Sequence, residues 1–363
     1  MMFSGSYHPD DVTFLLKPIE LGPTGLAQKE RLIQSGERHY SEMISRESLP
    51  SPAYLRVFHE AAAREKSRFA RDVLTLARRL ADLRTGPITI VSLARAGTPI
   101  GVLLGRGLRQ LLRRASRHFS VSIIRDRGID ERALAYILDH HSAESIVFVD
   151  GWTGKGVIAE ELRRAVVNFN ARHGVNLDAG LYTIADLCGA AAFAASAEDY
   201  LIPSSVLGAT ISGLVSRSIL NAEVIGPADF HGCLYYEEFA AHDLSRSFVD
   251  DVYAEIEQQA NAHSADSAGI SPQQRIELQQ ASAAFVANMQ RRFGVRNLYH
   301  IKPGLGEATR VLLRRVPDCV LVRDAGLADV AHLLLLARER NVPVIVDRAL
   351  PYTAAALIKE LDG

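Results

Sequence analysis

Apolar strands and amphipathic helices alternate through the middle of the chain, and this order constrains the fold more than any other feature. Short buried runs predict strands at residues 87–94, 119–125, 145–150 and 180–186. Apolar residues at helical spacing predict helices at 52–84, 98–112, 130–141 and 154–170. Repeated strand–helix–strand units build a parallel sheet with helices on both faces. We therefore predict an α/β fold that binds ligands at the carboxyl ends of its strands, near the topological switch point.

The composition is that of an ordinary globular protein. Of 363 residues, 48% are hydrophobic and 23% are charged, which suggests two or three domains. The sequence has neither a run of about 18 apolar residues nor the pattern of a signal peptide, so we expect no membrane partner. Cys188, Cys233 and Cys319 are too far apart for a disulfide framework or a zinc site and suit a reducing cytoplasm. We expect a cytoplasmic protein, and its oligomeric state stays open.

A small, polar stretch at residues 257–270 predicts a linker between two domains. Residues 1–256 then form the first domain, with an accessory subdomain at 188–255, and residues 271–363 form the second. Residues 275–363 hold 13 Lys or Arg and 9 Asp or Glu, a net charge of +4, against −5 for the rest of the chain. This asymmetry indicates an anionic partner for the second domain.

A glycine-rich turn follows the strand at 145–150, and its composition suits a phosphate. Backbone N–H groups from Thr153 to Gly156 can surround phosphate oxygens, and the glycines Gly154 and Gly156 allow close approach. The Thr153 hydroxyl and the Lys155 ammonium add donors. Asp150, at the end of the strand, can accept hydrogen bonds from ribose hydroxyls or hold a metal ion through water.

Two more loops at strand ends carry candidate anion ligands. In "SLARAGTP", Arg95 and the N–H groups around Ala96 and Gly97 suit a second anion such as pyrophosphate. Arg125 and Arg127 follow the strand at 119–125, and they form either a ribose or pyrophosphate contact or a solvated charged loop. Two anion-binding turns on neighbouring strand ends suit a substrate that carries phosphate at both ends.

These loops resemble those of type I phosphoribosyltransferases. The resemblance implies that Thr153–Gly156 hold the 5-phosphate of phosphoribosyl pyrophosphate and that Arg95–Gly97 receive its pyrophosphate. It also implies that Asp150 acts in catalysis on the ribose or on a Mg²⁺ ion. The chain departs from the usual signature, because Asp150 is followed by Gly151 rather than a second acid and Gly156 replaces the common Thr or Ser.

The whole chain resembles the bacterial StiP family, which is associated with tellurite resistance and stress response. The similarity includes "SRESLPSPAY", "LIPSSVLGATISGLVSRSILN" and "DFHG". It implies a magnesium-dependent phosphoribosyltransferase of ribonucleoside biosynthesis joined to a Pelota-type RNA-binding domain. One alternative is a non-catalytic regulator that senses a nucleotide and binds RNA. The other is a cysteine protease, since family names use that term; Cys188 follows a strand, and Cys233 is two residues from His231.

The sequence of the second domain predicts a small α/β/α sandwich. It begins with a helix capped by Ser271 and ends with a helix at 351–361. Its order resembles the Pelota and kink-turn-binding fold, whose RNA-binding loop corresponds to "GLGEATR", residues 304–310, with Gly306 in place of the usual Asn. Basic residues surround the loop: Arg291, Arg292, Arg296, Lys302, Arg310, Arg314 and Arg315. The resemblance implies that RNA is bound by Lys302, Gly304, Glu307, Arg310 and Arg314.

Overall fold

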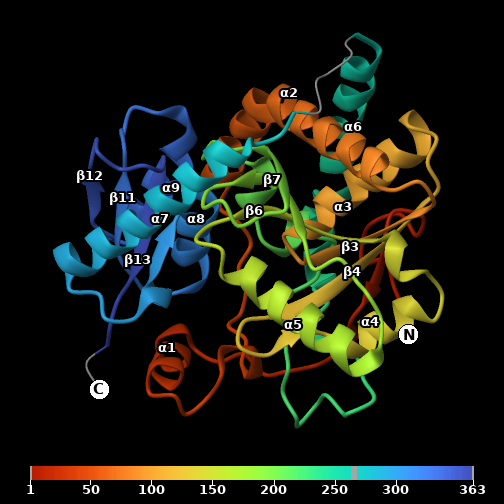
Figure 1. Cartoon of the computed structure of the whole chain (residues 1–363). Helices are drawn as coiled ribbons and strands as arrows, with labels where there is room; N and C mark the ends of the chain where they lie inside the picture. Colours follow the sequence, from red (N-terminus) through yellow and green to blue (C-terminus); the bar gives the residue numbers. More distant parts are fainter. Residues whose placement is uncertain (1, 263–267, 362–363) are drawn as a thin grey trace.

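The computed structural model describes residues 2–262 and 268–361, and its N-terminal domain is built on a parallel sheet (Figure 1). The strands follow the order β1 (Thr13–Leu15), β4 (Ser116–Ile124), β3 (Ile88–Ala94), β6 (Ile146–Thr153), β7 (Leu181–Asp186) and β8 (Phe193–Ser196). A short antiparallel strand, β5 (Gly128–Ile129), pairs with β4. The predicted α/β class and parallel sheet are confirmed. The chain passes from β3 to β4 on one side and returns to β6 on the other, so the switch point lies beside β3.

Helices cover both faces of this sheet, and each face has its own hydrophobic core. On one face lie α2 (Pro52–Leu83), α3 (Gly97–Arg106) and α6 (Ser245–Ala262), packed through residues such as Phe69 and Phe248. On the other lie α4 (Glu131–Leu138) and α5 (Val157–His173), packed through residues such as Leu134 and Leu162. The near-continuous apolar runs of the strands follow from burial on both faces.

The remaining elements of the N-terminal domain are short. Helix α1 (Leu26–Gln34) precedes α2, and β2 (Lys17–Pro18) pairs with β9 (Gly232–Cys233). A π-helical turn at Gly107–Leu111 extends α3, and 3₁₀ turns lie at Tyr40–Glu42, Ala143–Ser145, Pro203–Ser205, Ala209–Ile211 and Glu237–His242. None of the helices within residues 2–262 and 268–361 is long and apolar enough to cross a membrane.

Two boundaries differ from the predictions. Strand β6 continues to Thr153, where that residue pairs with Asp186 of β7, so Asp150 lies inside the strand rather than at its end. Helix α6 runs to Ala262, so the first part of the predicted linker at 257–270 is helical. Both differences have a tertiary cause: β7 provides partners for Trp152 and Thr153 of β6, and α2 packs along α6.

The C-terminal domain is a four-stranded mixed sheet with helices. It contains α7 (Pro272–Phe293), a 3₁₀ turn (Leu298–His300), β10 (Ile301–Pro303), α8 (Leu305–Arg314), β11 (Pro317–Val322), a second 3₁₀ turn (Ala328–Val330), α9 (Ala331–Glu339), β12 (Val344–Val346) and β13 (Ala354–Ile358). The strand order is β10-β13-β11-β12. The predicted cap of α7 is confirmed, because the Ser271 hydroxyl accepts a hydrogen bond from the Gln274 N–H at 3.2 Å.

The predicted helix at 351–361 is wrong, because this segment forms strand β13 in the interior of the sheet. Its sequence, AAALI, has the small apolar composition of a buried helix. A short apolar run has no periodicity that separates the two structures, and here strands on both sides satisfy the backbone.

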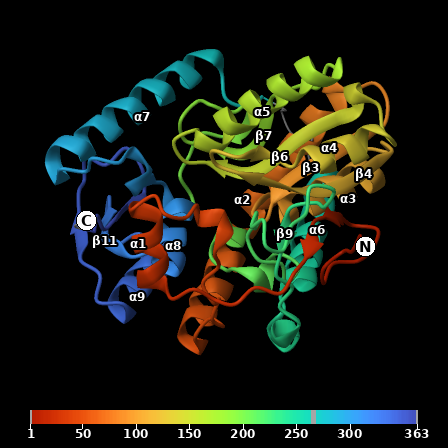
Figure 2. The same ribbon diagram turned by 90° about the horizontal axis from the view of Figure 1, so that it is seen from below.

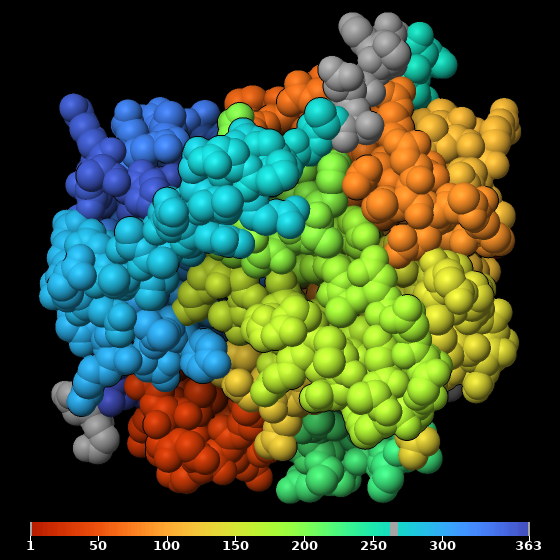
Figure 3. Space-filling model, in the orientation of Figure 1, coloured from red at the N-terminus to blue at the C-terminus, as the bar shows by residue number. Residues whose placement is uncertain are grey.

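The two domains share a hydrophobic core and lie directly against each other (Figure 3). Leu305 and Val311 of α8 belong to the same buried cluster as Tyr200 and Phe58 of the N-terminal domain. Figure 2 shows α1 beside the C-terminal domain. There the Glu30 carboxylate forms a two-pronged ion pair with Arg315, with N–O distances of 2.6 and 2.7 Å. The domain interface is therefore built from both apolar packing and buried charge.

Candidate functional site between the two domains

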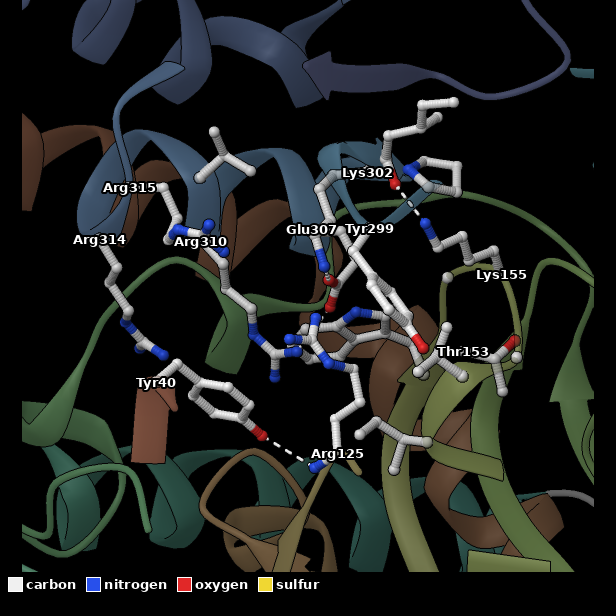
Figure 4. A pocket seen from close by; sticks show the side chains of 18 of the residues that line it. Tyr40, Arg125, Thr153, Lys155, Tyr299, Lys302, Glu307, Arg310, Arg314 and Arg315 are labelled. Carbon is white, nitrogen blue, oxygen red and sulfur yellow. Dashed lines mark hydrogen bonds and ion pairs between the residues drawn. The ribbon is translucent and has the colours of Figure 1, made fainter. Parts of the chain in front are cut away.

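A pocket of about 270 Å³ lies between the domains (Figure 4). The N-terminal domain contributes α1, the residues around Tyr40, Arg125 and the turn between β6 and α5, and the C-terminal domain contributes β10 and α8. The predicted turn therefore lines the pocket, at the carboxyl end of β6. Eight lining side chains are cationic, namely Lys29, Arg125, Lys155, Arg217, Lys302, Arg310, Arg314 and Arg315, and two are acidic, Asp150 and Glu307.

The turn between β6 and α5 is held by a cluster of three side chains behind the pocket wall. The Thr153 hydroxyl donates a hydrogen bond of 2.5 Å to Asp186 Oδ1 and accepts one from the Leu187 N–H. The Cys188 Sγ lies 3.4 Å from Thr153 Oγ1 and 3.6 Å from Asp186 Oδ1. Gly156 has a φ of +81°, which favours glycine, and a Cβ there would touch Cys188.

Asp150 and Trp152 line the pocket, and the Trp152 indole lies against Gly306 of the C-terminal domain. Burial raises the pKa of Asp150 to about 6, although the nearby Arg310 opposes this shift. The guanidinium of Arg310 lies 4.4 Å from the centre of the Trp152 ring and forms a 2.6 Å ion pair with Glu307. Charged residues of both domains therefore lie together on this side of the pocket.

Lys155, predicted to bind phosphate, lines the pocket and also contacts the C-terminal domain. Its ammonium donates hydrogen bonds to the carbonyl oxygens of Leu298 and, at 3.0 Å, of Ile301. Burial lowers the pKa of Lys155 to about 7, and the neighbouring Lys302 adds to this effect. The lysine joins the turn to the second domain while its side chain also lines the pocket.

The "SLARAGTP" loop, the second predicted anion site, is less accessible to a ligand than the glycine-rich turn. Arg95 is buried, with a 2.6 Å ion pair to Glu47 and a 2.7 Å hydrogen bond to the Val215 carbonyl. Gly97 packs so closely on β6 that a Cβ there would lie 2.8 Å from the Val149 carbonyl oxygen. Arg95 and Ala96 line a neighbouring cavity that shares Asp150 with the interdomain pocket. Their predicted contact with a pyrophosphate stays a prediction.

Arg125 and Arg127 separate in the structure. Arg125 lines the pocket, with its guanidinium 5.1 Å from the ring centre of Tyr40 and 4.0 Å from that of Tyr299. Arg127 is exposed, lies 3.5 Å from Glu42 and does not line the interdomain pocket.

The predicted RNA-binding residues face inward. Lys302, Glu307, Arg310 and Arg314 line the pocket, and Gly304 is buried against Leu187. Of the seven basic residues noted around this loop, Arg291, Arg292 and Arg296 are exposed, whereas the other four are half-buried at the domain interface.

Sequence reasoning missed Lys29, Tyr40 and Tyr299, which all line the pocket. They lie far from the glycine-rich turn along the chain and follow no motif, so no local pattern distinguishes them. Only the packing of α1 and the C-terminal domain against the turn brings them together.

The cysteines occupy different settings. Burial raises the pKa of each thiol to about 12, and Asp186 contributes to this shift at Cys188. His231 does not pair with Cys233; its Nδ1 lies 2.8 Å from the Ser122 hydroxyl. Cys319 lies in the C-terminal core. Cys188 alone of the three adjoins the pocket wall, through Thr153 and Gly156.

The pocket fits a magnesium ion poorly. Within the described ranges, no group of three or more His, Cys, Asp or Glu side chains is arranged to hold a metal. Asp150 and Glu307 are the two carboxylates among eight cationic side chains, and Glu307 is already paired with Arg310, so the lining would repel a divalent cation. Magnesium at Asp150 therefore stays an untested prediction that the lining does not favour.

Comparison with known proteins gives three matches. Residues 5–253 match the family described as "Tellurite-like stress resistance cysteine protease StiP", and residues 280–360 match the "PELOTA RNA binding domain". The chain is also 42% identical over 372 residues to "Cysteine protease StiP" of Acinetobacter baylyi (strain ATCC 33305 / BD413 / ADP1). That alignment covers 99% of this chain and 95% of the relative.

These matches confirm the predicted StiP and Pelota resemblances and overturn the predicted chemistry. The prediction of a phosphoribosyltransferase, and with it the transferase class, is wrong, because both the family and the relative are named as cysteine proteases. The error has a general cause. Glycine-rich turns at the carboxyl ends of parallel strands serve many reactions, so this local resemblance does not determine the chemistry.

Proposed function

Because the chain belongs to the StiP family, we propose that it is a cysteine protease whose nucleophile is Cys188. The relative's name supports the reaction class, and the position of one thiol supports the residue. Cys188 follows β7 at the carboxyl edge of the parallel sheet, next to the pocket wall. Cys233 is fully buried in β9, and Cys319 belongs to the RNA-binding domain.

The neighbours of Cys188 provide a route for its proton. Asp186 Oδ1 lies 3.6 Å from the sulfur, and the Thr153 hydroxyl contacts both groups. In this proposal the thiol proton passes to the Asp186 carboxylate as sulfur bonds to the peptide carbonyl carbon. Asp186 then protonates the leaving amine, and water hydrolyses the thioester and restores the thiol.

The buried position of Cys188 indicates that the proposed active site is inactive in this conformation. Cys188 is 6% exposed and its thiol has a raised pKa, so little thiolate forms at neutral pH. A Cβ at Gly156 would lie 3.4 Å from the sulfur, so the turn packs closely on Cys188 and has to shift before a peptide can reach the thiol. The protease is thus expected to need substrate or a partner to open the turn between β6 and α5.

Peptide hydrolysis by three variants of the full chain tests the assignment. Cys188→Ser should abolish cleavage of a fluorescent casein substrate and labelling by an epoxide inhibitor of cysteine proteases. Cys233→Ser and Cys319→Ser are matched controls and should keep both. A wild-type protein that cleaves nothing, with or without RNA, or a Cys188→Ser variant that remains active, would overturn it.

We also propose that the C-terminal domain binds RNA, and its match to the Pelota RNA-binding domain supports this partner. Three exposed arginines near the end of α7, Arg291, Arg292 and Arg296, offer contacts to phosphates on the outer surface. If all three reach phosphates, log affinity falls with log salt at a slope of roughly −2 to −3.

Gel shifts of the full chain test RNA binding. Arg291→Glu should weaken the binding of a structured RNA and reduce the salt slope, whereas the exposed Arg338→Glu on α9 is the control. Absence of RNA binding at low salt, or an equal loss of affinity in both variants, would show that these arginines are solvated surface residues without a role in RNA binding.

A further inference from the structure

The interdomain pocket holds more positive charge than its own acids can balance. Its eight cationic side chains face only Asp150 and Glu307 among the lining acids. Glu307 already pairs with Arg310 at 2.6 Å, and Glu30, next to the pocket, pairs with Arg315. Glu307 also lies 3.9 Å from Lys302, and Asp126, outside the lining, pairs with Arg125 at 2.9 Å. Four lining cations have no ion pair within the described residues: Lys29, Lys155, Arg217 and Arg314.

Several of these cations are held by neutral oxygens. Arg217 donates to the carbonyl oxygens of Tyr40, Met43 and Ser218. Lys155 donates to two carbonyls of the C-terminal domain, and Lys29 lies 3.4 Å from the Arg314 carbonyl. Such bonds orient a cation without cancelling its charge.

Arg314 is the lining cation best placed to bind a negatively charged group. Within the described ranges, its guanidinium has neither a hydrogen bond nor an ion pair, and it points into the pocket beside Tyr40 (Figure 4). Burial lowers the pKa of Arg314 to about 9, and Arg95 adds to that shift. The guanidinium is half-buried, and Glu47, the acid that acts to raise its pKa, is already paired with Arg95 at 2.6 Å. A negatively charged ligand would therefore be stabilised at Arg314.

Backbone donors are also available at the start of α5. The first residues of α5, Val157, Ile158 and Ala159, line the pocket, and a helix of 17 residues presents unpaired N–H groups and a positive dipole end there. The pocket therefore combines charge with directional donors.

We propose that this pocket binds a phosphoryl group, carried by a small phosphate compound or by the end of an RNA strand. A phosphate monoester carries a charge of about −1.5 to −2 at neutral pH and accepts several hydrogen bonds. Nine of the 24 lining residues belong to the C-terminal domain, which matches the Pelota RNA-binding domain. A volume of about 270 Å³ admits a terminal group and excludes a duplex.

The proposal extends the role of the "GLGEATR" loop. Gly304 and Gly306 of this loop are buried against Leu187 and Trp152 of the N-terminal domain, so the loop is closed to a folded RNA. Its charged side chains instead face the pocket. The site is independent of the identity of the nucleophile, because Cys188 is not among the lining residues.

Calorimetry and thermal melting of the full chain test the site. The probes are inorganic phosphate, a nucleoside 5′-monophosphate, and one short single-stranded RNA with either a 5′-phosphate or a 5′-hydroxyl end. At least one phosphate-bearing probe should bind and raise the melting temperature. Stronger binding of the 5′-phosphorylated RNA than of its 5′-hydroxyl form identifies the RNA end as the source, whereas binding of the small compounds alone identifies a free phosphate.

Arg314→Gln should weaken that binding by about tenfold to a hundredfold, because it removes a charge-assisted contact. It should leave the ligand-free protein at least as stable, since it removes a half-buried cation that has no ion pair within the described residues, and Arg314→Lys should restore part of the affinity. Arg338→Gln is the control. Cys188→Ser should bind the probes normally, which separates this proposal from the protease. No binding to any probe at low salt, or equal affinity in Arg314→Gln and wild type, would overturn it.

Discussion

Gly306 of α8 lies flat against the indole of Trp152, and a Cβ at residue 306 would be only 2.5 Å from the ring carbon Cε2. The pair joins the "GLGEATR" loop of the C-terminal domain to the end of strand β6 in the N-terminal domain. It also gives a physical reason for the glycine in "GLGEATR", where the resembled family has Asn: the indole occupies the space of a side chain.

We predict that Gly306→Ala destabilises the protein by about 2 kcal/mol, because overpacking outweighs the gain in helix propensity. Urea denaturation of the full chain measures this. Gly107→Ala is the control, since a Cβ there meets only Ala77 at 3.7 Å. Trp152→Ala should remove part of the penalty, and additive effects of the two changes would contradict the proposed contact.

Glu30→Gln should destabilise the protein by about 3 kcal/mol by leaving Arg315 without its buried partner. Burial by itself would raise the pKa of Glu30, but the hydrogen bonds and charge of Arg315, together with Gln34 and His300, outweigh it and hold the pKa below its ordinary value. The pair therefore stabilises the fold above the unfolded pKa of about 4.3 and is lost as pH falls through the lower folded value.

Denaturation at pH 7 and at pH 3 separates these effects. The difference between wild type and Glu30→Gln should shrink at the lower pH. The exposed Glu37→Gln should change stability little at either pH, and a similar loss in both variants would argue against the buried pair.

Lys29 makes the stability of the free protein rise with pH. Burial lowers its folded pKa to about 7, with Arg217 and Arg315 adding to the shift, while the unfolded lysine titrates near 10.4. Between these values the unfolded state binds more protons, so stability increases by up to about 1.4 kcal/mol per pH unit. Lys29→Met should be more stable than wild type at pH 7, by an amount that declines toward pH 9.

Urea denaturation from pH 7 to pH 9 checks this difference. The range ends at pH 9, because the cysteines of the unfolded chain ionise around this pH. In the folded protein, burial raises the pKa of Cys188 to about 12. Cysteine ionisation therefore favours the unfolded state and opposes the rise of stability with pH. A constant difference between the two proteins would show that Lys29 does not titrate in this window.

Thr153→Val should destabilise the protein by about 1–3 kcal/mol, because Asp186 and the Leu187 N–H lose their shared buried partner. If Cys188 is the nucleophile, the variant should also lose peptide hydrolysis at temperatures where it remains folded. Circular dichroism and casein cleavage measure the two effects, and the exposed Thr85→Val is the control. Full cleavage by a folded Thr153→Val variant would exclude a role for this hydroxyl in proton transfer.

Much of the fold was predictable because its signals are local. The strands and helices between Pro52 and Asp186 follow from periodicity, and the Ser271 cap follows from a short motif. The turn at Thr153–Gly156 was located for the same reason, and it does line the pocket. Strand β13 was misread because AAALI has no period of its own and is defined by the strands that flank it.

The sequence by itself determined the parallel sheet, the two domains and the presence of a glycine-rich turn, since each depends on neighbours along the chain. Only the tertiary structure decided what surrounds that turn. It places Gly306 on Trp152 and Lys155 on the Ile301 carbonyl, and it gathers Lys29 and Arg314 at the same pocket. These contacts join residues 120 or more positions apart in the sequence. They depend on the hydrophobic core that the domains share and on charges that lack a partner, and no local sequence pattern predicts either of these.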